Sequence, residues 1–597
     1  MSTDDPDYET DPYLLTVLSK KAEMITREMT QTLLKSARSG VINSARDFSS
    51  AITLYDGRQF MIDEGLPMHL GNVHLVPRKT LELFDDVSPG DCFLTNTPYA
   101  GSTHHADYTL HAPVFVEGEP LFWTVNRAHQ ADVGAPEPST YVGDAKTIYE
   151  EGPHFPSVRI QEGYEDREDI VRTCKLNIRS GETQWFGDYL AQVGAVRTGE
   201  EKLQALCEEY GVDTIRQFSE DWIAYGEEIM RSEIEKLPRK SIEYTAHHDP
   251  IPDVAPEGIP VTVSIEIRPG DARISVDLTD NVDNIPAGFN LSEATTTAAV
   301  YAGIFKNLGS NVPHNHGSIG RIDIEMAEGK VVGKPEYPVG TSLDTTNVAA
   351  VLTNAMQAAF GELGEPYGMA EGNAGVGASE PVVSGTDFRD GDEYVNELIF
   401  ATGGGPAVYG HDGWLAHTIV TSSGVIQLDS VEIDEQNFPI LVERYEFTPD
   451  SGGAGRWRGS PGTTTAITVR GDRMMASYFG TGKEFPPNGI LGGESGGALE
   501  VYRTTSDGDT VELPVMAMES VELDPGESLV CRNPGGGGYG DPYERPPEQV
   551  VRDVRRGYVT EEGARVDYGV VVDGDGDDYR IDDEETRAIR GSRDGGE

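Results

Sequence analysis

The spacing of apolar residues predicts helical segments near the start of the chain. Apolar side chains recur every four or seven positions, which indicates an amphipathic helix over about residues 12–39. They are Leu14, Leu18, Ile25, Met29 and Leu33. From there to about residue 156 the chain has short strand-like runs broken by Gly, Pro and Asn. Residues 198–237 return to helical spacing, and Thr198 and Glu201 stand three apart, as in a capping box.

Strict alternation of apolar and polar residues predicts a β-hairpin near the middle of the chain. Two alternating runs flank the turn Arg268–Asp271, and their apolar members are Val261, Val263, Ile265 and Ile267, then Ile274, Val276 and Leu278. A helix rich in Ala, Met and Leu is expected over about residues 344–362. Beyond it the pattern is β-like, with glycines concentrated in loops. We therefore predict an α+β fold, large and of several mixed regions, with a β-rich C-terminal part.

The domain organisation follows from these shifts in pattern. We expect a mixed α/β region over residues 1–245, a central α/β region over 246–445 and a β-rich region over 446–572. Residues 573–597 are rich in Asp, Gly and Glu, and we expect an acidic, disordered tail there.

Composition and charge narrow the class of protein. The 597 residues include 101 acidic and 47 basic side chains, for a formal net charge of −54. Such a field repels nucleic acids and anionic lipids, so neither is an expected partner. The acids are spread among apolar periodic segments, and 37% of residues are hydrophobic, which favours a folded chain. The composition is typical of halophilic proteins, whose acidic surfaces stay hydrated in a salty cytoplasm.

The location of the protein is suggested by its cysteines and its apolar runs. The four cysteines form no Cys-x-x-Cys pair, which fits a reducing compartment. The acidic N-terminus lacks an apolar signal core. No run approaches the roughly 18 apolar residues of a membrane span. We expect a cytoplasmic protein without membrane contact.

Two histidine-containing segments carry the candidate chemistry. The chain has 13 histidines, of which three lie within residues 96–107 and 126–134. Imidazole and carboxylate ligands suit a divalent transition metal such as zinc, manganese or iron. His104 and Asp107 can share one turn, and His129 follows the apolar run Leu121–Val125, which can pair with the strand after Asp107. Asp47 can complete the set. Spacing alone leaves two alternatives, with His105 replacing His104 or with histidines that only make hydrogen bonds.

Both segments resemble the hydantoinase B/oxoprolinase family. Its pattern at the first segment is approximately Asn-Asp-Pro-Tyr-x-Gly-Gly-Thr-His-Leu-Pro-Asp, and Asn126–Gly134 is similar to its later Asn-Arg-Ala-His-x-Ala-Asp-x-Gly. The resemblance extends over about 500 residues, in order, through the segments Arg46–Ser49, Pro67–Gly71, Ile148–Gly152, Asp450–Gly459, Gly535–Pro542 and Tyr568–Val570.

The resemblance implies a set of metal ligands. The family's ligands fall on Asp47, His104, Asp107 and His129, which selects His104 over His105. Two departures adjoin the site. Thr97 stands where the family has Asp, and His105-Ala106 replaces Leu-Pro; both changes bear on the substrate more than on the metal.

The resemblance also implies an activity and a partner. In this family an A-type subunit with an ATP-binding fold phosphorylates a cyclic amide, and the B-type subunit completes hydrolysis at its metal, where a bound water is made more acidic. Asp132 and Glu151 are candidate catalytic carboxylates for proton transfer, or else supports of His129 or of a loop. We expect a hetero-oligomeric hydantoinase or 5-oxoprolinase-like enzyme. The alternatives are a subunit of an ATP-dependent acetone or acetophenone-type carboxylase, and a non-catalytic assembly partner of the ATPase subunit.

The glycine runs Gly403–Gly405 and Gly535–Gly538 invite a phosphate-loop interpretation. Neither ends in the Lys-Ser/Thr of a Walker loop, and neither opens a helix. We interpret them as tight turns or places where backbones approach closely. The missing ATP motif agrees with ATP being bound by the partner.

Overall fold

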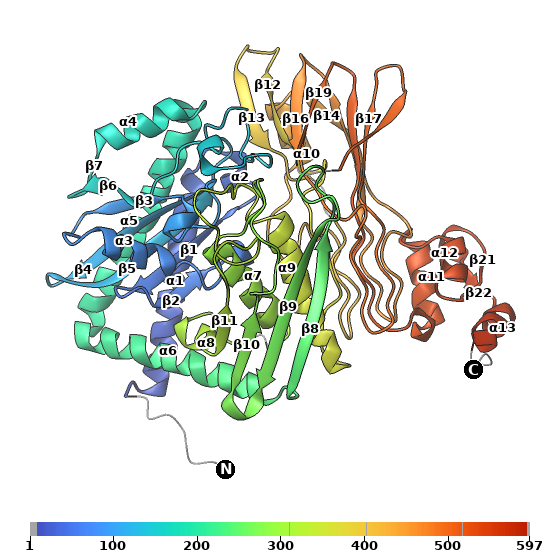
Figure 1. The fold of residues 1–597 in the computed structure, drawn as a ribbon, viewed down its shortest axis with the longest axis horizontal. Coiled ribbons are helices and arrows are strands. Elements are labelled where there is room, and N and C mark those ends of the chain that lie inside the picture. Colours follow the sequence, from blue (N-terminus) through green and yellow to red (C-terminus); the bar gives the residue numbers. More distant parts are fainter. Residues whose placement is uncertain (1–8, 310, 401–402, 516–517, 594–597) are drawn as a thin grey trace. The chain divides into compact units, whose positions relative to one another are not determined.

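The computed structural model describes residues 9–309, 311–400, 403–515 and 518–593 (Figure 1). It divides the chain into two compact units. The first contains Met1–Ser241 and Ser264–Thr345, and the second contains Ile242–Val263 and Thr346–Glu597. The mixture of helices and sheets confirms the predicted α+β class.

A seven-stranded antiparallel sheet forms the centre of the first unit. Its strand order is β2-β1-β5-β4-β3-β6-β7. The strands are β1 Phe48–Leu54, β2 Gln59–Asp63, β3 Cys92–Thr95, β4 Asp107–Val116, β5 Glu119–His129, β6 Val158–Glu162 and β7 Glu165–Asp166. Strands β1, β3 and β4 are buried along almost their whole length, so both faces of the sheet are covered.

The first unit also contains helices, and the first and fifth of them pack against the seven-stranded sheet. The helices are α1 Pro12–Ser36, α2 Gly40–Asn43, α3 Leu75–Leu83, α4 Glu168–Asn177, α5 Phe186–Tyr210, α6 Val212–Glu235, α7 Glu293–Phe305 and α8 His316–Ile319. The predicted helix at residues 12–39 is confirmed, and its side chains at Leu18, Met29 and Leu33 are fully buried. Asp11 caps it by accepting hydrogen bonds from the backbone N–H groups of Tyr13 and Leu14.

The predicted capping box at Thr198 and Glu201 is wrong. Thr198 lies in the middle of α5, where its hydroxyl donates to the carbonyl of Gly194 at 2.8 Å. A threonine inside a helix satisfies its hydroxyl in this way, so the spacing alone does not mark a helix start. The helical spacing at residues 198–237 belongs to two helices, which are separated at Gly211, where φ is +87°.

The predicted hairpin is confirmed. β9, Ile259–Arg268, pairs antiparallel with β10, Arg273–Asp277, and Ile267 lies opposite Ile274. The sheet order is β11-β10-β9-β8, with β8 at Lys240–His248 and β11 at Ile322–Glu325, and β11 runs parallel to β10. The helix expected over residues 344–362 is also present, as α9 Asn347–Ala359 followed by a 3-10 turn at Phe360–Leu363.

The second unit is rich in β-structure. One sheet has the order β13-β12-β16-β19 and another β14-β15-β20-β17-β18. Their strands are β12 Val382–Thr386, β13 Glu393–Glu397, β14 Ile440–Phe447, β15 Thr463–Val469, β16 Met474–Tyr478, β17 Glu500–Thr504, β18 Thr510–Leu513, β19 Glu519–Leu523 and β20 Ser528–Arg532. The remaining elements are α10 Val431–Asn437, α11 Pro547–Arg555, α12 Glu561–Val566, β21 Val572–Asp573, β22 Arg580–Ile581 and α13 Asp583–Arg593.

The composition of residues 573–597 predicts disorder, but this acidic segment has regular structure up to Arg593. Residues 594–597 lie outside the described residues. β21 and β22 form a small antiparallel ribbon, and Val572 lies opposite Ile581. Val572 belongs to a hydrophobic cluster that also contains side chains of α11 and α12, and Tyr579 and Ile581 pack against this cluster. Apolar residues too sparse to show a period along the sequence therefore anchor this segment.

Glycines of the second unit bring backbone segments into direct contact, and we call this region the glycine bundle. It contains Gly404, Gly405, Gly453, Gly459, Gly496 and Gly535–Gly538. The backbone of Gly536 donates to Ser460 and accepts from Gly453, at 2.9 and 2.8 Å. A Cβ on Gly536 would lie 2.0 Å from the carbonyl oxygen of Gly405. The interpretation of both glycine runs as close backbone approaches is confirmed.

Candidate metal centre

Three neighbouring strands of the seven-stranded sheet, β1, β5 and β4, have their candidate ligands at the same end. β4 begins at Asp107, β5 ends at His129, and β1 begins directly after Asp47. The strands are antiparallel, and Asp107 pairs with His129 while Phe48 pairs with Ala128. The predicted pairing of the strand before His129 with the strand after Asp107 is therefore confirmed.

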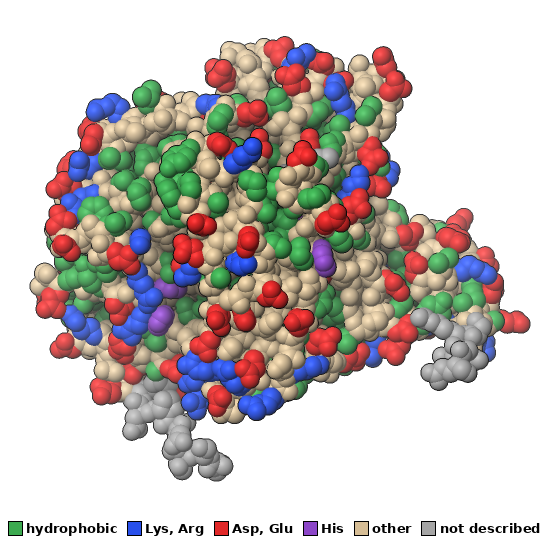
Figure 2. Space-filling view, viewed as in Figure 1, with side chains coloured by type: hydrophobic (Ala, Val, Ile, Leu, Met, Phe, Trp, Pro, Cys, Tyr) green, Lys and Arg blue, Asp and Glu red, His purple; other side chains and the backbone are tan. Residues whose placement is uncertain are grey.

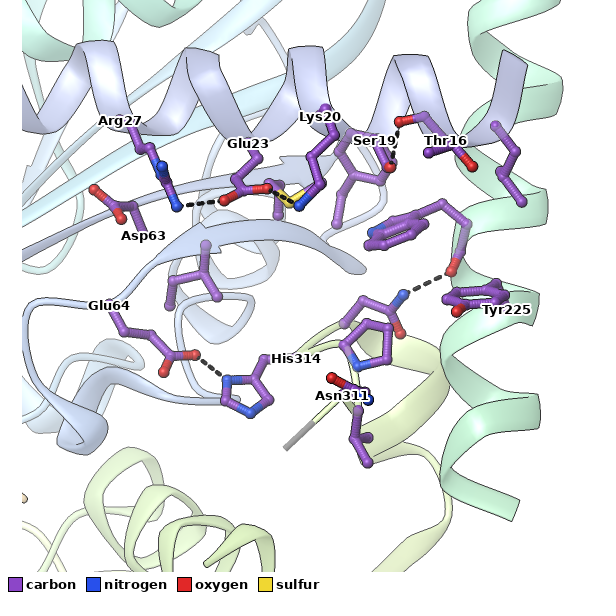
Figure 3. Close-up of a pocket in the computed structure, with 18 of the residues that line it drawn as sticks. Thr16, Ser19, Lys20, Glu23, Arg27, Asp63, Glu64, Tyr225, Asn311 and His314 are labelled. Atoms are coloured by element: carbon purple, nitrogen blue, oxygen red, sulfur yellow. Dashed lines mark hydrogen bonds and ion pairs between the residues drawn. The ribbon is translucent and has the colours of Figure 1, made fainter. Parts of the chain in front are cut away.

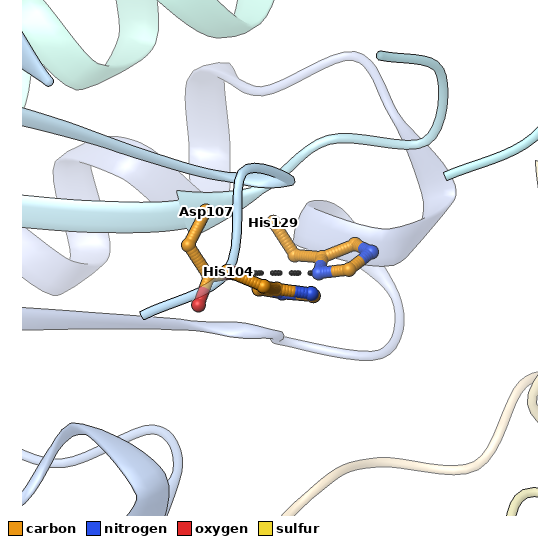
Figure 4. A group of neighbouring side chains, drawn as sticks. All are labelled: His104, Asp107 and His129. Carbon is orange, nitrogen blue, oxygen red and sulfur yellow. Dashed lines mark ion pairs between the residues drawn. The ribbon is translucent and has the colours of Figure 1, made fainter. Parts of the chain in front are cut away.

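The side chains of His104, Asp107 and His129 point toward one another (Figure 4). Asp107 Oδ1 lies 3.1 Å from His104 Nε2 and 3.3 Å from His129 Nδ1. Asp47 Oδ2 lies 3.8 Å from the same nitrogen of His129. All four residues are buried. His104, Asp107 and His129 form one group of possible metal ligands, and Asp47 belongs to an overlapping group with His69 and Asp107.

Hydrogen bonds at the far side of each ring indicate which nitrogen of His104 and His129 carries the proton. His104 Nδ1 lies 2.9 Å from the carbonyl oxygen of Ser342, which only accepts, so Nδ1 is the protonated nitrogen. His129 Nε2 lies 2.7 Å from the hydroxyl of Thr140, whose own proton goes to the carbonyl of Gln130. The other nitrogen of each ring, Nε2 of His104 and Nδ1 of His129, therefore faces the carboxylate of Asp107.

A lone pair facing a carboxylate oxygen is unfavourable unless a cation lies between them. Without a metal ion, protonation supplies that cation. Burial lowers the pKa of His104, but the Asp107 carboxylate and the Ser342 carbonyl outweigh it and raise the pKa to about 9. Burial likewise opposes ionisation of Asp107, yet His104, His129 and His69 hold its pKa well below its usual value. The donor set of two imidazoles and two carboxylates fits a divalent transition metal.

His69 is a member of this cluster that the sequence reasoning did not single out. Its Nε2 lies 3.4 Å from Asp107 Oδ2, and its Nδ1 lies 2.8 Å from the hydroxyl of Ser49. That hydroxyl accepts the backbone N–H of Gly65 at 3.0 Å, so its proton is available to His69 Nδ1. Nε2 is then the protonated nitrogen and faces Asp107, so His69 helps to orient the carboxylate of Asp107.

A second group of residues near the cluster comes from a distant part of the sequence, the segment Gly340–Asp344. The carboxylate of Asp344 is fully buried and accepts the backbone N–H of Ser292 at 2.9 Å. Its other oxygen has no hydrogen-bond partner among the described residues. Burial raises the pKa of Asp344 to about 7, and its charge acts on His104. The segment has no motif, so only the fold identifies it.

The two predicted proton carriers lie in different surroundings. Asp132 forms an ion pair with Arg179 at 2.9 Å and accepts the backbone N–H of the same residue at 2.7 Å. Glu151 is fully buried and faces His105 and His154. Neither carboxylate belongs to the groups formed by Asp47, His69, His104, Asp107 and His129. Their role in proton transfer stays a prediction.

A cavity of about 950 Å³ lies elsewhere in the first unit, between α1, β2, α6 and residues 311–315 (Figure 3). Lys20, Glu23 and Arg27 of α1 form a row of ion pairs along one wall. On the opposite wall Glu64 points toward His314, and their side chains are 2.6 Å apart. No residue of the candidate metal centre lines this cavity.

The fold and the buried imidazole–carboxylate cluster define a large α+β chain with a candidate metal centre. The family model for hydantoinase B/oxoprolinase matches residues 11–542, and the chain belongs to this family. It is 32% identical to the beta subunit of caprolactamase from Pseudomonas jessenii over 595 residues, which are 97% of this chain and 99% of the relative. It is 28% identical to the B subunit of a putative D-/L-hydantoinase from Pseudomonas sp. strain NS671, over 97% of this chain and 98% of the relative.

Solved structures share the fold. The crystal structure of ATP-dependent caprolactamase from Pseudomonas jessenii matches with a TM-score of 0.89 and 29% identity, over 98% of this chain and 100% of that chain. A nucleotide-free acetone carboxylase structure matches with a TM-score of 0.87 and 17% identity, over 98% of this chain and 83% of that chain. At that identity the second likeness concerns the fold alone. The predicted family, fold class and enzyme class are confirmed.

The surface agrees with the composition. Asp and Glu side chains are spread over the visible face, with Lys and Arg between them (Figure 2). Among the described helices, none combines the length and the apolar character that crossing a membrane requires.

Proposed function

We propose that this chain is the metal-carrying B-type subunit of an ATP-dependent enzyme that hydrolyses a cyclic amide. The observation that carries the proposal is the buried cluster of Asp47, His104, Asp107 and His129 in a chain of the hydantoinase B/oxoprolinase family. The likeness to the beta subunit of a caprolactamase along nearly the whole of both chains supports it.

The proposed ligands are Asp47, His104, Asp107 and His129. A divalent metal ion in such a site lowers the pKa of a bound water toward neutrality. The residues around it keep the ligands in place. Thr140 and the Ser342 carbonyl fix the tautomers of the two ligand histidines. The hydroxyl of Thr103 donates to Asp107 Oδ2, and His69 lies against the same oxygen.

The chemistry of amides explains the need for a partner. An unstrained amide is a poor electrophile, and phosphorylation of its oxygen creates a leaving group. This chain has no Walker motif among its glycine runs. We propose that ATP is bound by an A-type subunit, which phosphorylates the substrate, and that the two chains form a hetero-oligomer.

Proton transfer is proposed for Asp344, with Asp132 and Glu151 as the alternatives. The Asp344 carboxylate is buried, has one oxygen without a hydrogen bond among the described residues and acts electrostatically on His104. Its pKa of about 7 suits an acid or base near neutral pH. Both oxygens of Asp132 already accept hydrogen bonds from Arg179.

Asp344→Asn is expected to lower kcat by about a hundredfold, because the amide cannot carry the proton. Its metal content is expected to equal that of the wild type, since Asp344 is no proposed ligand. Steady-state kinetics and elemental analysis measure the two effects. Glu151→Gln and Asp132→Asn are the matched variants. Full activity of Asp344→Asn, with loss in Glu151→Gln, would return the role to Glu151.

The proposed function is tested by purifying the chain together with an A-type subunit and supplying ATP with lactams, hydantoins or 5-oxoproline. Ring opening that requires ATP and both chains is the expected result. Labelled bicarbonate distinguishes the alternative reaction, since its incorporation into the product would establish a carboxylase. If the A-type subunit alone catalyses the reaction, this chain is a non-catalytic assembly partner.

We infer that the acidic surface is adapted to a salty cytoplasm. At low ionic strength the excess acidic side chains, which give the net charge of −54, repel one another. Raising KCl from about 0.1 M to about 1 M shortens the Debye length from about 10 Å to about 3 Å, so the melting temperature is expected to rise. Differential scanning calorimetry measures it, with sucrose of equal osmolality as the control. A melting temperature that is constant or falls with KCl contradicts the inference.

A further inference from the structure

Three tyrosines, Tyr99, Tyr149 and Tyr337, gather in the first unit, and we call them the tyrosine patch. The ring of Tyr337 packs edge-to-face against both others, with its centroid 5.3 Å from that of Tyr99 and 6.5 Å from that of Tyr149. The hydroxyls of Tyr149 and Tyr337 lie 2.6 Å apart and share a hydrogen bond. These two residues are nevertheless 72% and 58% exposed, so most of their surface is open to a partner.

Hydrogen bonds tie together the three segments that carry these rings. The backbone N–H of Ile148 donates to the carbonyl of Pro338 at 3.0 Å, and Thr147 forms an antiparallel bridge with Val339. The hydroxyl of Tyr99 donates to the carbonyl of Val339 at 2.9 Å. The patch is therefore held in one arrangement before a partner binds, and preorganised groups lose little conformational entropy on association.

Two of these segments continue to the candidate metal centre. Tyr99 stands five residues before His104 in the same loop. Tyr337 stands five residues before Ser342, whose carbonyl oxygen lies 2.9 Å from His104 Nδ1. A short length of chain on each side thus connects the exposed rings to the buried cluster.

Exposed aromatic rings held in this way are typical of an interface between proteins. Tyrosine is enriched at such interfaces, where a few aromatic side chains contribute most of the binding free energy. The segments that carry Tyr149 and Tyr337 also expose more acidic than basic side chains, namely Asp144, Glu150 and Glu336 against Lys146. A complementary partner surface is therefore basic, with apolar pockets for the rings.

We propose that the tyrosine patch is the surface on which the A-type subunit docks. This inference rests on the proposed function, in which a substrate phosphorylated by the partner is hydrolysed at the metal centre of this chain. Enclosing an activated intermediate prevents side reactions with water. A partner seated on the patch delivers the substrate next to the segments that build the metal centre, which explains why the patch and the buried cluster share these segments.

The experiment measures binding between the two full chains in the absence of ATP and substrate. The A-type subunit is titrated by calorimetry into the wild type, into a double variant that combines Tyr149→Ala with Tyr337→Ala, and into Tyr13→Ala. Tyr13 is the control, since it is 79% exposed on α1 and lies outside the patch. The double variant is expected to bind about thirtyfold or more weakly, as for interface hot spots, and Tyr13→Ala is expected to bind as the wild type.

Activity measurements separate docking from a role in folding or in substrate binding. Raising the concentration of the A-type subunit is expected to restore the wild-type kcat of the double variant, with its metal content and melting temperature unchanged. A double variant that binds the A-type subunit as tightly as the wild type overturns the proposal. A raised KM in that variant would then assign the patch to the substrate, and altered self-association in ultracentrifugation would assign it to a second copy of this chain.

Failure of the docking surface can be told apart from failure of the proposed function. Equal binding by the wild type and the double variant overturns the surface alone. A wild type that does not bind the A-type subunit overturns both the surface and the partner of the proposed function. Circular dichroism verifies folding, and the two single alanine variants replace the double variant if it does not fold.

Discussion

His104→Ala is expected to lower ATP-dependent hydrolysis by more than about ten-thousandfold. The imidazole of His104 is a proposed ligand whose lone pair faces Asp107 at 3.1 Å. Without it the metal ion is held by too few groups, and the lowering of a water pKa from about 15.7 to about 7 is lost. Kinetics of the complex with the A-type subunit measure the activity, and elemental analysis measures the metal.

His69→Ala provides a graded comparison for the same site. His69 holds Asp107 and is no proposed ligand, so a loss of about tenfold to a hundredfold is expected in activity or metal affinity. His411→Ala, far along the chain and exposed, is expected to behave as the wild type. A fully active His104→Ala enzyme that still contains its metal is incompatible with the proposed ligand set.

Gly536→Ala is expected to destabilise the protein by about 3 kcal/mol or more, the upper range for overpacking. The added Cβ would lie 2.0 Å from the carbonyl oxygen of Gly405, and a backbone atom cannot move aside as a flexible side chain does. The segment also exchanges hydrogen bonds with Ser460 and Gly453, so its displacement breaks further contacts. The melting temperature and the yield of folded protein measure the effect.

Gly270→Ala is the matched control for that substitution. Gly270 lies in the turn between β9 and β10, a Cβ added there would meet no heavy atom within 4 Å, and its φ is not positive. The stability of this variant is expected to stay within about 0.5 kcal/mol of the wild type. Equal melting temperatures for Gly536→Ala and the wild type would mean that the glycine bundle tolerates side chains.

Elements with a strong local pattern could be predicted from the sequence. The helix at the start of the chain and the hairpin β9–β10 each bury one regular face, and that face is visible as a period of apolar residues. The prediction of a capping box was wrong because a threonine three residues before a glutamate is equally compatible with a helix interior. Near the C-terminus α13 and the ribbon of β21 and β22 carry too few apolar residues to produce a period.

The candidate site could be predicted only in part. Asp107 and His129 adjoin a strand pair that the apolar pattern indicates, so their proximity followed from antiparallel pairing. The position of Asp47 depended on the family resemblance. Ser342 and Asp344 reach the site through long-range packing, which leaves no trace in local spacing. His69 lies in a short turn whose motif was visible, but nothing in that motif indicates a contact with Asp107.

The glycine bundle has a thermodynamic consequence. Its segments bury peptide groups against peptide groups, with few side chains between them. Unfolding exposes mostly polar surface there, and exposure of polar surface lowers the heat capacity, whereas exposure of apolar surface raises it. The bundle therefore reduces the heat-capacity change of unfolding per residue, and it flattens the dependence of stability on temperature.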